Sequence, residues 1–114
     1  MKIVILALLF PTLAMSAEIL ETPNYKVSIQ SNCQEGEVGC SNYVYEGQSK
    51  KSGNSISLKG SSWHTTCNDG ETPCRFLGYK FKNGNIMYYV HQDGLLEVVT
   101  NKNEVILSEQ GVWQ

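Results

Sequence analysis

The chain has 114 residues, a formal net charge of −2 and a pI of about 5.6. This length supports one modest hydrophobic core and is too short for two domains. A weakly acidic protein lacks the positive charge that binding to nucleic acid or to an anionic membrane needs, so neither is an expected partner.

The N-terminal segment has the features of a secretory signal peptide. Lys2 is followed by an apolar stretch over residues 3–10 and then by small residues up to Ala17. This stretch is too short to span a membrane, which takes about 20 apolar residues. We expect cleavage after Ala17, with the sites after residues 14 and 16 as alternatives, and a single soluble domain over residues 18–114. No cysteine precedes Cys33, so no lipid anchor is expected in the mature form.

Alternation of apolar and polar residues with a period of two predicts strands along the rest of the chain. The first combines Tyr25, Val27 and Ile29 on one face. Further strands are predicted over residues 42–46, 55–59, 61–66, 75–82, 85–91, 95–100 and 104–109, with 112–113 as a short last pairing segment. In the strand 75–82 the alternation places Leu77, Tyr79 and Phe81 on one face.

Turn residues separate these strands. Asn83-Gly84 and Asp93-Gly94 are strong hairpin signals, and Asn101-Lys102-Asn103 connects the last pair of long strands. Short strands with such turns between them are typical of antiparallel sandwiches and small barrels. The sequence therefore predicts an all-β fold, a small antiparallel β-sandwich or barrel of about eight strands, stapled by disulfides.

The four cysteines lie in two copies of one loop, Cys33–Cys40 and Cys67–Cys74, offset by 34 residues. Each copy has an amide, an acid, a glycine and a glutamate after its first cysteine. Such pairs indicate disulfides and an oxidising compartment. Loop entropy favours the long-range bridges Cys33–Cys67 and Cys40–Cys74, at about 3.8 against about 2.5 kcal/mol for a local bridge. The glycine-centred reversals favour the local pairs, which are our expectation.

No metal site is expected. Six residues separate the cysteines of each pair, whereas zinc ligands are typically two to four residues apart. The loop acids Glu35, Glu37, Asp69 and Glu71 lack the ligand density of a calcium loop. His64 and His91 are the two histidines of the chain, and we interpret them as structural or surface residues, with His91 beside Tyr89 on the polar face.

The sequence does not predict an enzyme or a cofactor. No serine has the surroundings of a nucleophile elbow, no glycine-rich loop precedes a helix, and oxidised cysteines cannot act as nucleophiles. We therefore predict no catalytic residues.

The run Cys74-Arg75-Phe76-Leu77-Gly78-Tyr79, with the closing residues 107–113, resembles an uncharacterised family of small exported proteins of Gram-negative bacteria. The resemblance covers residues 33–114 and implies a periplasmic location and a shared fold. The chain also resembles the periplasmic lysozyme-inhibitor barrels in size, signal and strand layout. Their inhibitory Ser-Ala-Ser-Gly-Ala-Arg-Tyr loop is absent, so this second resemblance concerns architecture alone.

Two functions are compatible with these features. One is a small periplasmic binding protein, an inhibitor or immunity protein whose protein partner is an envelope-directed enzyme. Its candidate contact residues are Glu35, Glu37, Asp69 and Glu71, whose side chains we expect to be dispensable for the turns because Gly36 and Gly70 supply the backbone freedom. The alternative is a small-ligand or envelope-maintenance protein with a barrel mouth lined by Tyr43, Tyr45, Tyr79, Tyr88 and Tyr89. For these tyrosines we prefer the interpretation that alternate rings pack in the core.

Overall fold

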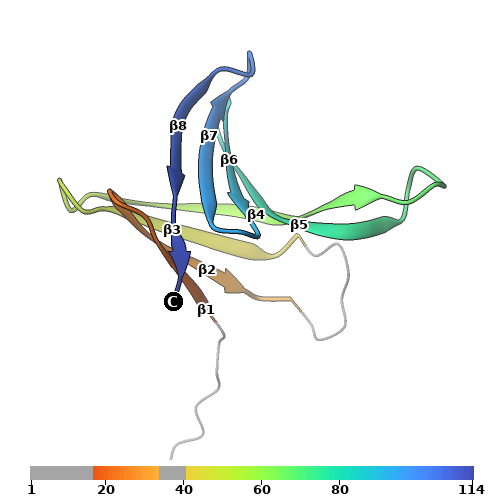
Figure 1. Ribbon diagram of the computed structural model, residues 1–114, viewed down its shortest axis with the longest axis horizontal. Coiled ribbons are helices and arrows are strands. Elements are labelled where there is room, and N and C mark those ends of the chain that lie inside the picture. Colours follow the sequence, from red (N-terminus) through yellow and green to blue (C-terminus); the bar gives the residue numbers. More distant parts are fainter. Residues whose placement is uncertain (1–16, 34–40) are drawn as a thin grey trace, which may run out of the picture.

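Nine antiparallel strands follow one another in a computed structural model, which describes residues 17–33 and 41–114 (Figure 1). They are β1 (Ala17–Glu21), β2 (Tyr25–Ser31), β3 (Tyr43–Ser49), β4 (Ser55–Thr66), β5 (Pro73–Asn83), β6 (Ile86–His91), β7 (Leu95–Thr100), β8 (Val105–Gln110) and β9 (Val112–Trp113). Within the described ranges no helix is long and apolar enough to cross a membrane. The predicted all-β fold is confirmed. The predicted signal peptide lies outside the described residues except for Ala17, at which β1 begins.

The strands form one sheet in the order β8-β7-β6-β5-β4-β3-β2-β1-β9, so each strand from β1 to β8 pairs with its neighbour in the chain. The predicted hairpin turns join them. Gly84 and Asn103 have φ values of 63° and 64°, the left-handed conformation that tight hairpin turns require. The predicted turn chemistry therefore agrees with the turns that the structure contains.

The last strand closes the sheet into a nearly complete barrel. β8 pairs with β7, and after Gly111 the chain continues as β9, which pairs with β1 at the opposite edge through Leu20 and Trp113. A Cβ atom at Gly111 would lie 2.8 Å from the backbone oxygen of Glu21, so the crossing depends on glycine. The Gly111 amide donates to the Gly94 carbonyl at 2.8 Å, which holds the bend against the β6–β7 turn.

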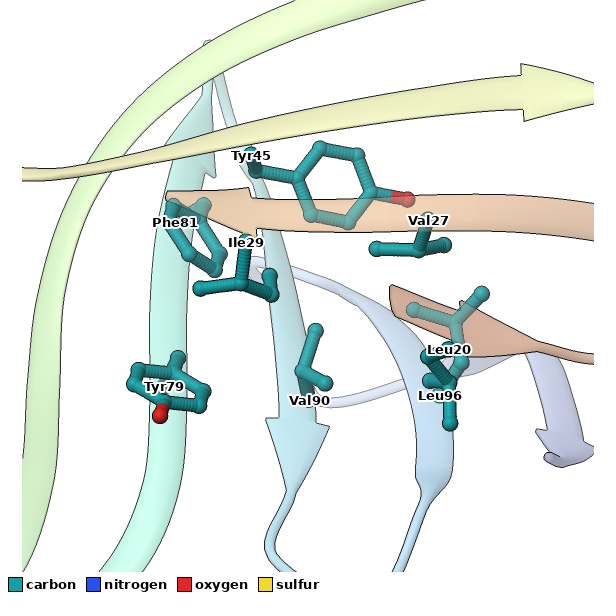
Figure 2. Close-up of a cluster of buried hydrophobic side chains, with 8 residues drawn as sticks. All are labelled: Leu20, Val27, Ile29, Tyr45, Tyr79, Phe81, Val90 and Leu96. Atoms are coloured by element: carbon teal, nitrogen blue, oxygen red, sulfur yellow. The ribbon is translucent and has the colours of Figure 1, made fainter. Parts of the chain in front are cut away.

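The core is a cluster of inward-facing side chains from six strands (Figure 2). Its buried members are Leu20, Val27, Ile29, Tyr45, Tyr79, Phe81, Val90 and Leu96. They occupy alternate positions of their strands, as expected when one face of a sheet is buried. The ring centroids of Tyr45 and Phe81 lie 5.2 Å apart in a tilted arrangement.

Three details of the strand prediction are wrong. β1 was not predicted, because it follows directly on the apolar N-terminal stretch and has little alternation of its own. The two strands predicted over residues 55–59 and 61–66 are one continuous strand, β4, since Gly60 does not interrupt its pairing with β3 and β5. The third error concerns the inward face of β5.

The alternation predicted for β5 breaks at a bulge. Gly78 is opposite Trp63 and Phe76 is opposite His64, which leaves Leu77 as an extra residue. An extra residue reverses the face on which the preceding side chains lie. Phe76, rather than Leu77, therefore packs against the core, with its ring centroid 5.2 Å from that of Tyr79.

One predicted disulfide is confirmed and one cannot be placed. Cys67 and Cys74 are bonded to each other, with their Cα atoms 5.1 Å apart, so the long-range pairing of Cys67 is wrong. The second bridge was predicted to join Cys33 to Cys40. Cys33 is disulfide-bonded, and residue 40 lies outside the described residues.

Candidate functional site

The strongest candidate site is a cleft at the end of the barrel where β2–β4 and β6–β8 diverge. Figure 1 shows these two groups of strands separating from each other. The cleft has a volume of about 370 Å³. Its lining residues are Tyr25, Tyr45, Gly47, Ser49, Asn54, Ile56, Tyr88, Leu96, Val98, Ile106 and Leu107. Most of these side chains are apolar or aromatic, and none of these described residues is charged.

Tyr45 forms the floor of this cleft. Its ring packs against Phe81 beneath it and meets Tyr88 edge-on, with centroids 5.4 Å apart. The glycine two residues further along β3 makes room for the ring, because a Cβ atom at Gly47 would lie 2.6 Å from the Tyr45 hydroxyl oxygen. The pair Tyr45 and Gly47 therefore fixes where the phenol lies.

The Tyr45 hydroxyl has no protein hydrogen-bond partner among the described residues. The side chain is only 2% exposed, yet its oxygen is not sealed inside the protein and is reached from the cleft that the residue lines. In Figure 2 this oxygen points away from Phe81 and Ile29. Because this oxygen is accessible from the cleft, a water or another molecule there can form hydrogen bonds with it.

The same hydroxyl stays protonated at any physiological pH. Burial raises the pKa of Tyr45 well above its usual range, and the neighbouring phenols of Tyr88 and Tyr25 raise it further. The group can therefore donate one hydrogen bond and accept others. It cannot act as a base.

The rim of the cleft is apolar and accessible. Ile56 on β4 is 39% exposed and Ile106 on β8 is 56% exposed. Ile106 lies at a bulge, since Val98 is opposite Leu107 while Val99 is opposite Val105. Bulges redirect side chains next to binding sites, and this one leaves an isoleucine at the rim instead of in the core.

A carboxylate on β8 holds the closing strand against the β1–β2 turn. Glu109 on β8 accepts hydrogen bonds from the Thr22 hydroxyl at 2.7 Å, from the backbone N–H of Asn24 at 3.1 Å and from the side-chain Nδ2 of Asn24 at 2.6 Å. Burial acts to raise the pKa of Glu109, but the hydrogen bonds from Asn24 and Thr22 outweigh it and hold the pKa below its usual value. These three hydrogen bonds, which we call the Glu109 clasp, connect β8 to the β1–β2 turn.

A second feature is a projecting hairpin, residues 61–76. The pairing of β4 with β3 ends at Gly60 and that of β5 with β6 begins at Gly78, so beyond these positions the described strands pair only β4 with β5. The ribbon extends away from the barrel (Figure 1), and the Cys67–Cys74 bridge staples its tip.

Asp69 takes part in the turn at that tip, a role that the sequence analysis did not predict. Its carboxylate accepts hydrogen bonds from the amides of Glu71 and Thr72, both at 2.9 Å, and from the Thr72 hydroxyl. These bonds, first the Thr72 side chain and then the two amides, lower the pKa of Asp69 to about 2. Glu71 is exposed, whereas Glu35 and Glu37 lie outside the described residues.

His91 was predicted to lie on the polar face beside Tyr89, and on the outer face of the sheet it does lie in a group of aromatic rings. The Trp63 ring contacts Tyr89 and His91 at centroid distances of 5.0 and 5.2 Å, and His91 is 2.8 Å from Glu97. His64 instead meets Phe76 edge-on. Within residues 17–33 and 41–114 no cluster of ligand-type side chains is able to hold a metal ion.

The structure separates the five tyrosines predicted to line a barrel mouth. Tyr45 and Tyr88 line the cleft, Tyr43 and Tyr79 contact each other at a centroid distance of 4.9 Å elsewhere in the core, and Tyr89 lies outside. Tyr25 lines the cleft but was not among the five. Its alternation with Val27 and Ile29 is the signal that places it on the inner face.

Another hollow, of about 460 Å³, lies over the outer face of β1–β4. Polar side chains such as Lys26, Glu46 and Gln48 predominate in its lining, in contrast to the mainly apolar lining of the cleft. The cleft is therefore the better candidate. Comparison of the chain with known protein families, with curated proteins and with solved structures finds no match. The resemblance to a family of small exported proteins stays a prediction.

Proposed function

We propose that this chain is an exported binding protein that holds one small, mainly apolar molecule in the cleft of its barrel. The observation that carries this proposal is the unpartnered hydroxyl of Tyr45 at the floor of an apolar cleft of about 370 Å³. This is the alternative of the two functions drawn from the sequence, and the structure gives it the more specific support.

The size and lining of the cleft are those of a ligand site. Small-molecule sites are typically concave, between about 300 and 1,000 Å³, and mostly apolar with a few placed polar groups. Ile56 and Ile106 remain exposed at the rim, although burying either side chain would lower the free energy of the protein. A bound molecule would bury both side chains and fill the space above Tyr45.

The chemistry of the lining favours binding over catalysis. The described residues around the cleft offer hydroxyl and amide groups but no carboxylate, imidazole or thiol. A tyrosine whose pKa is raised by burial does not supply a general base near neutral pH. The cleft therefore orients a ligand without activating it.

A neutral fluorescent probe tests this proposal. We expect N-phenyl-1-naphthylamine to bind the oxidised protein at one site with a Kd of about 10 μM or tighter, which corresponds to about 7 kcal/mol. Ile106→Glu places a charge at the apolar rim and should weaken binding at least 10-fold. Val112→Glu is the matched control, because Val112 is 67% exposed and does not line the cleft.

Two results would overturn the proposal. One is equal loss of probe binding in both variants, which would indicate non-specific adsorption. The other is a wild-type protein that binds no probe and is a dimer in sedimentation, while Ile106→Glu is a monomer. The cleft would then be an interface between copies of the chain.

The projecting hairpin supports a second function, that of an inhibitor or immunity protein. A rigid, stapled ribbon that extends beyond the barrel loses little entropy when it enters an enzyme cleft. The exposed Glu71 at its tip, with Glu35 and Glu37 of the other loop, would complement a cationic active site. Asp69 is the least suitable of the four acids as a contact, because the turn already uses its carboxylate.

Affinity capture from periplasm and from lysates of competing bacteria tests the second function. If an envelope enzyme is captured, Glu71→Gln should slow its association at low salt, whereas Glu104→Gln in the β7–β8 turn should not. Equal association rates for the two variants would place the interface elsewhere.

A further inference from the structure

The three tyrosines of the cleft form a group whose hydroxyls have no assigned partners. Tyr45 lies at the floor, Tyr88 meets its ring edge-on, and Tyr25 lines the same cleft from β2. Among the described residues, none makes a side-chain hydrogen bond to any of these three hydroxyls. Three tyrosine side chains thus line one mainly apolar space from β2, β3 and β6.

From this arrangement we infer that the ligand is a neutral, mainly apolar molecule with a carbonyl-type oxygen, which accepts a hydrogen bond from the Tyr45 hydroxyl. This inference rests on the proposed function and specifies its ligand class. Tyr25 and Tyr88 line the same cleft and carry further hydroxyl groups that can bind the ligand. The aliphatic walls contact its apolar part.

The absence of charge in the lining argues that the ligand is neutral. None of the described residues around the cleft is a lysine, arginine or histidine that would balance a carboxylate or phosphate. Lys50, in the neighbouring β3–β4 turn, is already bonded to the Glu21 carboxylate at 3.0 Å and to the Thr22 carbonyl at 2.8 Å. An anion in this cleft would lose its hydration without a compensating charge, which is strongly unfavourable.

Packing alone does not account for a tyrosine at position 45. The ring contacts with Phe81 and Tyr88 involve the aromatic carbons, and a phenylalanine would make them equally well. The hydroxyl oxygen is accessible from the cleft and makes no hydrogen bond to another described residue, so it adds nothing to this packing. A ligand group that bonds to this hydroxyl would give the tyrosine a role that packing does not.

A site with such a donor should discriminate between molecules of the same shape. Removing the matching acceptor leaves the buried donor unpaired when the ligand binds, which is the basis of selectivity in polar sites. We expect the discrimination to be about 10-fold, which corresponds to one hydrogen bond of about 1.4 kcal/mol.

Three probes of nearly the same shape test the inference by isothermal titration calorimetry: 2-acetylnaphthalene, 2-isopropenylnaphthalene and 2-naphthoate. We expect the ketone to bind about 10-fold more tightly than the hydrocarbon, and the carboxylate to bind at least 10-fold more weakly than the ketone. Tyr45→Phe should remove the preference for the ketone and keep the affinity for the hydrocarbon. Tyr89→Phe on the outer face is the matched control and should change neither.

The outcomes separate this inference from the proposed function. If ketone and hydrocarbon bind equally to the wild type, if Tyr45→Phe keeps the preference, or if the carboxylate binds best, the ligand class is wrong while the site stands. If none of the three probes binds, the site itself is refuted. Denaturant unfolding of Tyr45→Phe, which should be at least as stable as the wild type, shows that a loss of selectivity does not come from misfolding.

Discussion

The clasp at Glu109 should contribute a large share of the stability that closes the barrel. Glu109→Ala removes three hydrogen bonds to a carboxylate, from the Thr22 hydroxyl and from two groups of Asn24. Bonds to charged groups contribute about 1.5–3 kcal/mol each when well buried. Because this site is partly exposed and water can replace part of the loss, we expect a total of about 2–3 kcal/mol. For a domain of this size that loss lowers Tm by about 10–15 °C.

Thermal and urea unfolding measure this loss. Glu109→Gln keeps one acceptor oxygen and should lose about half as much stability as Glu109→Ala. Glu104→Ala is the matched control: its side chain is exposed in the β7–β8 turn, and its removal should change stability by less than about 0.5 kcal/mol. The probe affinity of Glu109→Ala should also fall, since β8 carries one wall of the cleft.

The pH dependence gives a second readout. The pKa of Glu109 in the folded protein lies below its usual value of 4.5, because the hydrogen bonds outweigh the opposing effect of burial. A lowered pKa means that the contribution is complete above the unfolded-state pKa and is lost as pH falls through the folded-state pKa. The stability difference between wild type and Glu109→Ala should therefore be constant above about pH 5 and shrink under more acidic conditions. If Glu109→Ala is as stable as Glu104→Ala, or the difference persists in acid, the clasp does not close the barrel.

Three further predictions follow from local geometry. Gly47→Ala places a Cβ atom 2.6 Å from the Tyr45 hydroxyl oxygen. The free energy of unfolding in urea should therefore fall by about 1–3 kcal/mol, and the probe should bind at least 10-fold more weakly. An unchanged affinity would contradict the assigned position of the ring. The NMR chemical shift of the Glu71 backbone amide should change with the titration of the Asp69 carboxyl at about pH 2, and not at the usual carboxyl pKa of 3.8. Asp69→Asn should abolish that change. A midpoint near 3.8 would show that the turn does not use the carboxylate. Replacing both cysteines of the Cys67–Cys74 bridge by serine should remove about 2.5 kcal/mol of loop-closure stabilisation. The rate of amide hydrogen exchange should then increase more in the projecting hairpin than in the core. An equal increase in both would show that the hairpin unfolds only with the barrel.

Much of the fold could be predicted because its causes are local. A period of two sets the strand faces, and Asn-Gly and Asp-Gly pairs set the turns, so β2, β3 and β6–β8 agree with the prediction to within a few residues. The bulge at Leu77 could not be predicted in this way. It depends on how Trp63 and His64 of the opposite strand are accommodated, which is a property of the pair of strands and not of either sequence.

The cleft could not be predicted for the same reason. Its two walls belong to strands far apart in the chain, and they meet because Gly111 lets the last strand cross to β1 while Glu109 binds the β1–β2 turn. Nothing in the local pattern around Ile56 or Ile106 distinguishes a rim residue from a core residue. The sequence pointed to the tyrosines as a group, but only the register of the sheet separates those in the cleft from the others.

The contrast between the two ends of the molecule bears on which function the fold serves. In the projecting hairpin, Asp69 and the Cys67–Cys74 bridge hold the described tip in place. In the cleft, by contrast, Ile106 is 56% exposed, and no hydrogen bond joins the Tyr45 hydroxyl to another described residue. Exposed apolar side chains such as Ile106 contribute little to the stability of the fold, and clusters of them often mark functional surfaces. We therefore propose the cleft, and not the tip of the hairpin, as the place where this protein would bind a ligand.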